Sequence, residues 1–224
     1  YWWPQNTSDL ENAVAPEADE LIRLEGDGEN KNWANQVEYI EFRDLEFSYV
    51  DRKGEDELVS ENELEPIVMR NSENPYSAVF MRGTANCAII NCTMRHLGTY
   101  AVSMHNYTQN NRVINCTMED LGSGGVEIYG YGPGFVDNNG RNTVLNNVIR
   151  NTGKAPYMHS SAVTLFGTSY NDIRLNLIEK VPYSAIYMAG SNPSLMNPNH
   201  FGRKGVAACD TYGNQGAMNR VREN

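Results

Sequence analysis

The sequence lacks long apolar runs and an excess of basic residues. No stretch of the 224 residues approaches about 18 consecutive apolar side chains, and no basic segment precedes an apolar one. We therefore expect neither a membrane span nor an uncleaved signal peptide. Only 18 Lys and Arg face 28 Asp and Glu, for a formal net charge of −10. Because proteins that bind nucleic acids neutralise phosphates with basic side chains, we expect no nucleic-acid partner.

Cysteine is scarce, and the common cofactor motifs are missing. The four cysteines, at positions 87, 92, 116 and 209, include no CxxC pair, and the sequence contains no HExxH, P-loop, GxSxG or dinucleotide-binding motif. We therefore predict no metal site and no cofactor. Cys92 and Cys116 are predicted to be free, buried thiols, although their spacing would also permit a disulfide.

Asparagine is abundant, with 28 residues, and it marks an internal repeat. Asn91–Gly98 (NCTMRHLG) returns 24 residues later as Asn115–Gly122 (NCTMEDLG), and weaker copies follow at 146–153 and 175–182. A second motif starts at residues 78, 101, 125, 162 and 185. The copies alternate apolar with polar residues and contain no amphipathic helix, which predicts short strands separated by turns.

This repeat predicts an all-β fold, a parallel β-helix solenoid with coils of about 23–24 residues. We expect the coils to span residues 1–190, with an acidic insertion at about 50–74 and a loop at about 129–142. Residues 191–224 show no further clear coil, and we expect an irregular C-terminal segment there. The chain is expected to be a fragment of a longer solenoid.

Stacked coils turn each repeat position into a column. The first outer column reads Arg23, Phe80, Ser103, Glu127, Thr164 and Tyr187, and the second reads Glu25, Arg82, His105, Tyr129, Phe166 and Ala189. An inner column of Cys92, Cys116, Asn147 and Asn176 predicts an asparagine ladder that satisfies backbone groups from coil to coil. A further column, Arg95, Glu119, Arg150 and Glu179, alternates in sign and predicts ion pairs between adjacent strands.

The outer face offers one carboxylate in the central coils, Glu127. Asp137 lies in the Gly- and Tyr-rich loop that could fold over that face, and a carboxylate pair at about 5–9 Å is what glycoside hydrolysis needs. His105 or His159 could tune or replace one partner. We therefore take Glu127, Asp137 and His105 as candidate catalytic residues. Candidate sugar contacts are Arg82, Tyr129, Tyr131, His159, Phe166 and Tyr187, because sugars present apolar faces and hydroxyl rims.

Several of these runs resemble a known family. Tyr1–Pro4, Leu21–Gly26, Ile40–Phe47, Asn171–Ile178 and Val181–Ile186 are similar to bacterial right-handed β-helix proteins of the pectin-lyase-like superfamily. The resemblance covers residues 1–190 and points to a glycoside-hydrolase-like branch. It implies a secreted, periplasmic or cell-surface protein that acts on polysaccharides, and it places catalytic acids of that branch in coils after residue 191. The polygalacturonase hallmarks (NTD, DD, GHG, RIK) and the calcium cluster of pectate lyases are absent.

The leading hypothesis is a glycoside hydrolase that binds a polysaccharide or oligosaccharide along the outer sheet. One alternative is a polysaccharide lyase or epimerase acting on uronate glycans, in which Arg82 and His105 form a cationic clamp. Residues 77–224 hold 12 basic and 8 acidic residues, so the overall acidity does not exclude a uronate. The other alternative is a non-catalytic, glycan-binding solenoid that uses the same aromatic columns without acid–base chemistry. A structural reading of Tyr129, Phe166 and Tyr187 is that they only pack under neighbouring loops. The sequence indicates no oligomeric state.

Overall fold

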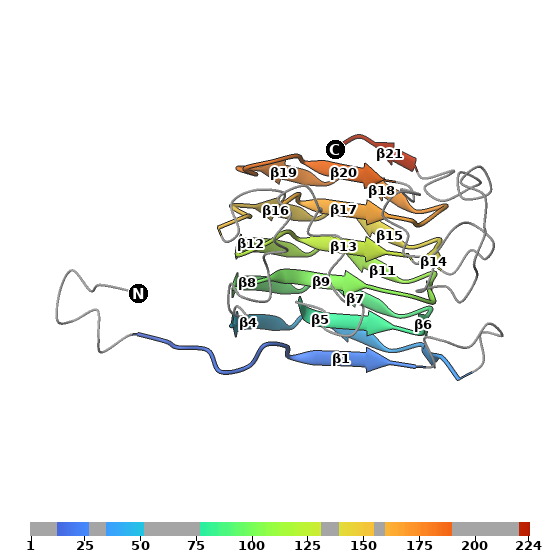
Figure 1. Cartoon of the computed structure of the whole chain (residues 1–224), viewed down its shortest axis with the longest axis horizontal. Helices are drawn as coiled ribbons and strands as arrows, with labels where there is room; N and C mark the ends of the chain where they lie inside the picture. Colours follow the sequence, from blue (N-terminus) through green and yellow to red (C-terminus); the bar gives the residue numbers. More distant parts are fainter. Residues whose placement is uncertain (1–12, 27–34, 52–76, 131–138, 155–159, 190–219) are drawn as a thin grey trace, which may run out of the picture.

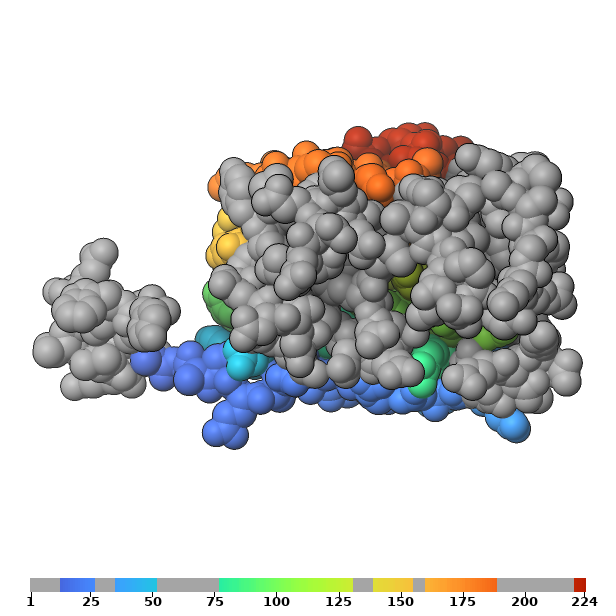
Figure 2. Space-filling model, in the orientation of Figure 1, coloured from blue at the N-terminus to red at the C-terminus, as the bar shows by residue number. Residues whose placement is uncertain are grey.

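The structure is a computed structural model of the chain, and it describes residues 13–26, 35–51, 77–130, 139–154, 160–189 and 220–224. Within these ranges every regular element is a β-strand. The strands form successive coils stacked in sequence order, from blue β1 at one end to orange β20 and red β21 at the other (Figures 1 and 2).

Each coil contributes up to four short strands. The first contains β1 (Ile22–Glu25), β2 (Val37–Glu38), β3 (Glu41–Arg43) and β4 (Glu46–Val50). The second contains β5 (Ser77–Arg82), β6 (Thr84–Ala85), β7 (Ala88–Ile90) and β8 (Thr93–Leu97). The third contains β9 (Tyr100–Met104), β10 (Thr108–Gln109), β11 (Arg112–Ile114) and β12 (Thr117–Leu121). The fourth contains β13 (Val126–Tyr129), β14 (Asn139–Gly140), β15 (Thr143–Leu145) and β16 (Val148–Arg150).

The last described strands are β17 (Val163–Phe166), β18 (Asp172–Arg174), β19 (Leu177–Glu179), β20 (Ile186–Ala189) and β21 (Arg220–Arg222). They complete four parallel sheets that run along the stack, in the orders β1-β5-β9-β13-β17-β20, β14-β10-β6-β2, β21-β18-β15-β11-β7-β3 and β19-β16-β12-β8-β4. The predicted parallel solenoid is therefore confirmed. β21 pairs with β18, so the segment predicted as irregular at 191–224 includes a strand that the repeat did not indicate.

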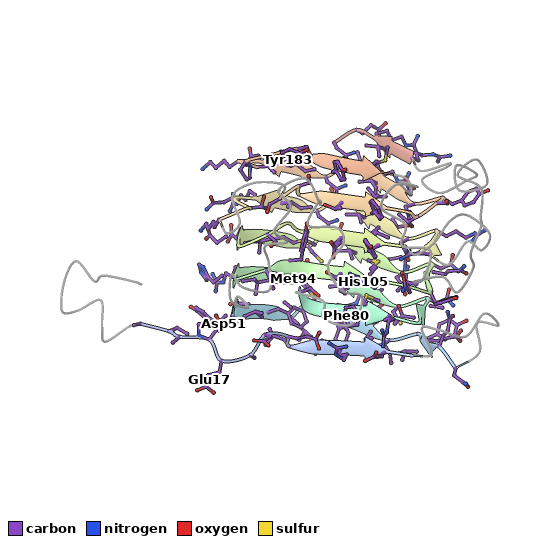
Figure 3. All side chains as sticks on the ribbon, in the orientation of Figure 1. Glu17, Asp51, Phe80, Met94, His105 and Tyr183 are labelled. Carbon is purple, nitrogen blue, oxygen red and sulfur yellow. The ribbon has the colours of Figure 1, made fainter. Side chains whose placement is uncertain are left out.

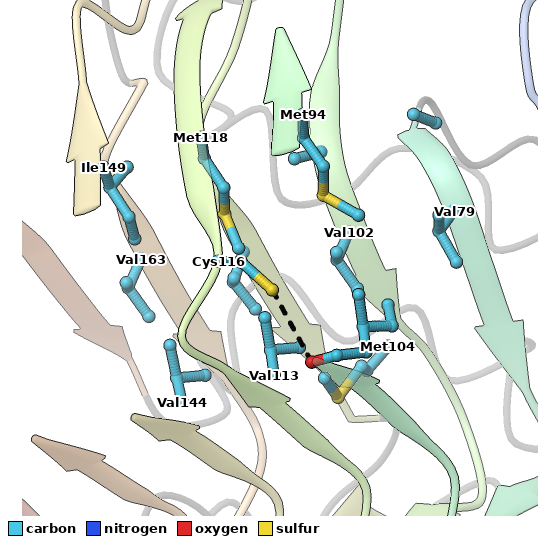
Figure 4. Close-up of a cluster of buried hydrophobic side chains, with 14 of the residues drawn as sticks. Val79, Met94, Val102, Met104, Val113, Cys116, Met118, Val144, Ile149 and Val163 are labelled. Carbon is cyan, nitrogen blue, oxygen red and sulfur yellow. Dashed lines mark hydrogen bonds between the residues drawn. The ribbon is translucent and has the colours of Figure 1, made fainter. Parts of the chain in front are cut away.

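The core lies inside the stack and is built from columns of apolar side chains. Val102, Val126 and Val163 occupy one register position of the first sheet, and all three are fully buried. Met94, Met118 and Ile149 lie side by side in the same cluster (Figure 4). Met188 pairs with the buried Leu165, but it is 51% exposed because β20 is the outermost described strand of its sheet.

Buried asparagine side chains connect consecutive coils, as predicted. Asn147 Oδ1 accepts a hydrogen bond from the backbone N–H of Cys116 at 2.8 Å, and Asn176 Oδ1 accepts one from the N–H of Asn147 at 3.0 Å. The side-chain amide of Asn147 donates in turn to the carbonyl of Val113 at 3.0 Å. Asn224 extends the ladder, because its Oδ1 accepts from the N–H of Asn176 at 3.0 Å.

Cysteine occupies the ladder position in the second and third coils. Asn147 and the later ladder amides donate to the carbonyls of Val113, Val144 and Ile173, which share one register column with Phe42 and Ile89. Cys116 Sγ lies 3.6 Å from the carbonyl of Ile89, and Cys92 Sγ lies 3.7 Å from that of Phe42. Each thiol also lies 3.3 Å from the carbonyl two residues before it, so its single weak S–H donor is shared between these two acceptors. Both cysteines are free and buried, as predicted.

A second ladder runs five residues before the first, and the sequence reasoning missed it. The N–H of Cys87 donates to Asn111 Oδ1 at 2.9 Å, that of Asn111 to Asn142 Oδ1 at 3.0 Å, and that of Asn142 to Asn171 Oδ1 at 3.0 Å. The two ladders stand at the two ends of the third sheet, whose strands lie between them. Together they satisfy the backbone at both turns that bound this sheet.

Exposed asparagines form the turns that precede the ladder residues. Asn91, Asn115 and Asn146 have φ values of 54–57°, a left-handed conformation that asparagine tolerates better than most side chains. Of the predicted charge column, Glu119 pairs with Arg150 at 2.6 Å. Arg95 instead forms its ion pair with Glu46 at 2.9 Å, on the strand of the preceding coil.

Replacing Asn147 with aspartate should cost about 3 kcal/mol or more of the free energy of unfolding, because it removes the amide donors and buries a charge in the ladder. The matched control is Asn115→Asp, which is exposed and keeps the oxygen that accepts from Asn146 at 2.9 Å. It should cost less than about 0.5 kcal/mol. Equal losses in urea denaturation would contradict a structural role for the ladder.

Cys116 should make the protein less stable at high pH. Burial raises the pKa of its thiol from 9.0 to about 11. Below pH 9 the thiol is protonated in both the folded and unfolded states, whereas above pH 9 only the unfolded state ionises, so stability falls as pH rises toward 11. The stability difference between the wild-type chain and Cys116→Ala should shrink by about 2 kcal/mol by about pH 10.5. A difference that does not change with pH would contradict burial of this thiol.

Candidate functional site

The outer face of the first sheet carries the residue columns that the repeat predicts. The register pairs Arg23 with Phe80, Phe80 with Ser103, Ser103 with Glu127, Glu127 with Thr164, and Thr164 with Tyr187. The second column is confirmed in the pairs of Glu25 with Arg82, Tyr129 with Phe166 and Phe166 with Ala189. His105 directly follows β9 and stands in this column between Arg82 of β5 and Tyr129 of β13. The alternation of side chains along parallel strands thus gathers residues far apart in sequence.

Glu127 is the centre of a small hydrogen-bonded group. Its Oε2 lies 3.1 Å from His105 Nε2 and accepts a hydrogen bond from Ser103 Oγ at 3.2 Å. The side chains of Glu127 and His105 are only 13% and 5% exposed, and Ser103 is fully buried. Because the serine donates to the carboxylate and not to the imidazole, the three residues do not form a nucleophilic Ser-His-Asp arrangement. They orient a carboxylate instead.

The His105 ring is enclosed by aromatic side chains. Its centroid lies 5.3 Å from those of Phe80 and Tyr129, and Figure 3 shows Phe80 and His105 next to each other. Since a carboxylate only accepts hydrogen bonds, His105 Nε2 carries the proton when Glu127 is ionised. His105 Nδ1 is buried and has no hydrogen-bond partner among the described residues.

The predicted sugar contacts differ in how accessible they are. Tyr129 stacks on Phe166 with centroids 5.3 Å apart and ring planes 8° apart, and only 9% of Tyr129 is exposed. Tyr129 therefore packs mainly against protein. Phe166 and Tyr187 are half-buried, and the Tyr187 ring lies 6.4 Å from Tyr183.

Arg82 is part of an ion-pair network on the second column. Its guanidinium pairs with Glu25, which also pairs with Arg23 at 3.1 Å. Partial burial raises the pKa of Glu25, but the hydrogen bonds and charges of Arg23 and Arg82 outweigh this effect and hold that pKa below its usual value. The positive charge of Arg82 therefore already has a carboxylate partner, which weakens its assignment as a clamp for a uronate.

Tyr100 is a site residue that the sequence reasoning missed. Its hydroxyl lies 3.5 Å from Thr164 Oγ1, beside Glu127 in the first column. The side chain reaches this position across Gly124, where an added Cβ would come within 2.6 Å of Tyr100 Cε1 and 2.0 Å of the carbonyl oxygen of Ser161. The sequence signal for this contact is Gly124, a glycine at the register position beside the large Tyr100, which leaves room for the tyrosine side chain to cross.

Three candidate residues lie outside the described residues: Asp137, Tyr131 and His159. The structure therefore brings together Glu127, His105, Arg82, Tyr129, Phe166 and Tyr187 on one face, and the pairing of Glu127 with Asp137 stays a prediction. Within the described ranges no three His, Cys, Asp or Glu side chains group as metal ligands. The same ranges contain no helix long and apolar enough to cross a membrane.

A family model described as the right-handed β-helix region matches residues 59–224. The chain belongs to the right-handed β-helix family. A solved structure described as "Glycoside hydrolase" is similar to this right-handed β-helix with a TM-score of 0.57 and 15% identity, over 79% of this chain and 34% of that one. The chain thus spans about a third of the length of that structure, and the likeness concerns the fold. No curated protein matches.

The hydrogen bond to Glu127 should fix the protonation pattern of His105. In ¹⁵N-labelled protein whose His105 ring is neutral, we expect a protonated Nε2 and an unprotonated Nδ1. Ring nitrogen chemical shifts measure this directly, and exposed His96 serves as the internal comparison. A proton on His105 Nδ1 would contradict the described hydrogen bond.

Proposed function

We propose that this right-handed β-helix is a carbohydrate-active protein, and specifically a glycoside hydrolase in which Glu127 acts directly at the scissile bond. The observation that carries the proposal is the Glu127 carboxylate on the outer face, held by Ser103 and His105 through Oε2. It is the only carboxylate in the two outer columns between the second and fifth coils, where the structure describes both columns. The description of the structurally similar protein as a glycoside hydrolase supports the same class.

The geometry suggests which half of the reaction Glu127 performs. Both donors meet the same oxygen, and hydrogen bonds of this kind stabilise a negatively charged carboxylate. An ionised carboxylate serves as the base that activates water or as the nucleophile at the anomeric carbon. The proton for the leaving oxygen then comes from a second carboxylic acid, and Asp137 is the candidate that we retain for it.

Substrate contacts follow from the accessible part of the same face. Phe166 and Tyr187, half-buried in adjacent coils, offer ring faces to a polysaccharide that runs along the stack. Tyr131 and His159 remain candidate contacts. The proposal includes an exported location, secreted, periplasmic or on the cell surface, where polymeric glycans are met.

The decisive test is Glu127→Gln in the whole chain. Release of reducing ends from a panel of polysaccharides should fall by at least about 100-fold, because the amide can act neither as a base nor as a nucleophile. The matched control is Glu119→Gln, which removes a carboxylate paired with Arg150 on a different sheet and should keep wild-type rates. Unfolding midpoints of both variants show whether they fold.

Wild-type rates in folded Glu127→Gln would overturn the catalytic role of Glu127. An unsaturated product that absorbs in the near ultraviolet would instead identify a lyase. Glycan binding by the wild-type chain without any product on prolonged incubation would replace the hydrolase with a non-catalytic glycan-binding solenoid.

A further inference from the structure

Unsatisfied polar atoms gather at one corner of the solenoid, beside Glu127. Seven buried side-chain nitrogen or oxygen atoms in the described residues have no hydrogen-bond partner, and four of them belong to the last residue of β5 and to the segment 105–108 that follows β9. These four are Arg82 Nε, His105 Nδ1, Asn106 Oδ1 and Thr108 Oγ1. Buried polar atoms in native proteins are normally matched by protein, by ordered water or by a ligand. The corner therefore indicates a missing partner.

The backbone holds the end of β5 and the segment after β9 side by side. The N–H of His105 donates to the carbonyl of Met81 at 2.8 Å, and the N–H of Gly83 donates to the carbonyl of Asn106 at 2.9 Å. Arg82 and His105 are consequently neighbours in the second outer column. The other ring nitrogen of His105 is 3.1 Å from Glu127, so the corner and the proposed catalytic carboxylate share one imidazole.

The unsatisfied atoms include both a donor and acceptors. Arg82 Nε–H can only donate, and Asn106 Oδ1 can only accept. His105 Nδ1 accepts, because the proton of the ring is on Nε2 facing Glu127. A hydroxyl group matches this set, since it accepts one hydrogen bond and donates another. A carboxylate or sulfate has no proton to donate, and it would face the acceptors without any attraction to them.

We propose that Arg82 Nε and His105 Nδ1 form a subsite for a hydroxyl group of an uncharged sugar, next to Glu127. The inference rests on the proposed function and specifies its substrate class as a neutral glycan. A uronate also carries hydroxyls, but its carboxylates would lie near Glu127 and would meet an Arg82 that already pairs with Glu25. The charge balance agrees, because Glu25 already pairs with the Arg82 guanidinium. The Arg82 side chain is 24% exposed, so the residue that carries the buried Nε itself borders the accessible surface.

The test measures binding of defined oligosaccharides by calorimetry to the whole chain. The neutral probes are cellohexaose, xylohexaose and mannohexaose, and the charged probe is hexagalacturonate. A probe that the chain cleaves is measured in Glu127→Gln, whose amide oxygen can still accept from His105. We expect at least one neutral probe to bind at least about tenfold more tightly than hexagalacturonate.

Two variants remove one subsite atom each. Arg82→Lys keeps the positive charge opposite Glu25 but has no Nε–H, and His105→Gln keeps a donor for Glu127 but has no Nδ1. Each should weaken binding of the neutral probe about tenfold, the usual effect of one lost hydrogen bond to a buried partner. Arg95→Lys makes the same substitution in an ion pair on another sheet and should bind normally.

Four results would overturn the subsite: preference for hexagalacturonate, wild-type affinity in folded Arg82→Lys, wild-type affinity in folded His105→Gln, or no binding of any probe by the folded chain. Failure of the proposed function is distinguishable. Neutral probes that bind through Arg82 but are never hydrolysed by the wild-type chain leave the subsite in place and overturn the hydrolase. If the wild-type chain hydrolyses the neutral probes but Arg82→Lys binds them with unchanged affinity, the subsite is overturned and the hydrolase stands.

Discussion

The hydrogen bond from a backbone N–H to the buried side-chain amide of the next coil is the interaction on which this structure depends. It occurs at both ends of the third sheet, through Asn147 and its column and through Asn142 and its column. Each amide accepts from one coil and donates to a carbonyl, so neighbouring turns cannot slide by one residue without leaving buried groups unpaired. Where cysteine replaces asparagine, the thiol retains only the weak donor half of this arrangement.

This fixed register explains how a site arises from distant residues. Ser103 and Glu127 are 24 residues apart in sequence, yet the register pairs them on adjacent strands. The sheet alternation then directs their polar side chains to the outer face, while Val102 and Val126 fill the core. The same register brings Arg82 beside His105, which joins the unsatisfied corner to the catalytic candidate. Function in this account is therefore a property of columns and not of any local sequence motif.

The repeat alone was sufficient to predict the parallel coils, the outer columns and the first asparagine ladder, because stacking preserves sequence offsets. It could not predict how far a side chain reaches or which of two neighbouring partners it selects. Tyr100 reaches Thr164 over Gly124, and Arg95 selects Glu46 in place of Glu119, choices that depend on space and on side-chain reach. The exposure of Met188 follows from its place at the end of the sheet. The second ladder has the same spacing in the sequence, with asparagines five residues before those of the first.

A high-resolution crystal structure of the chain with a bound neutral oligosaccharide tests the central claim most directly. The account predicts a sugar hydroxyl between Arg82 Nε and His105 Nδ1, with the glycosidic bond facing the Glu127 carboxylate and the Ser103 and His105 hydrogen bonds retained. An oligosaccharide bound on another sheet, with only water at the Arg82–His105 corner, would contradict it.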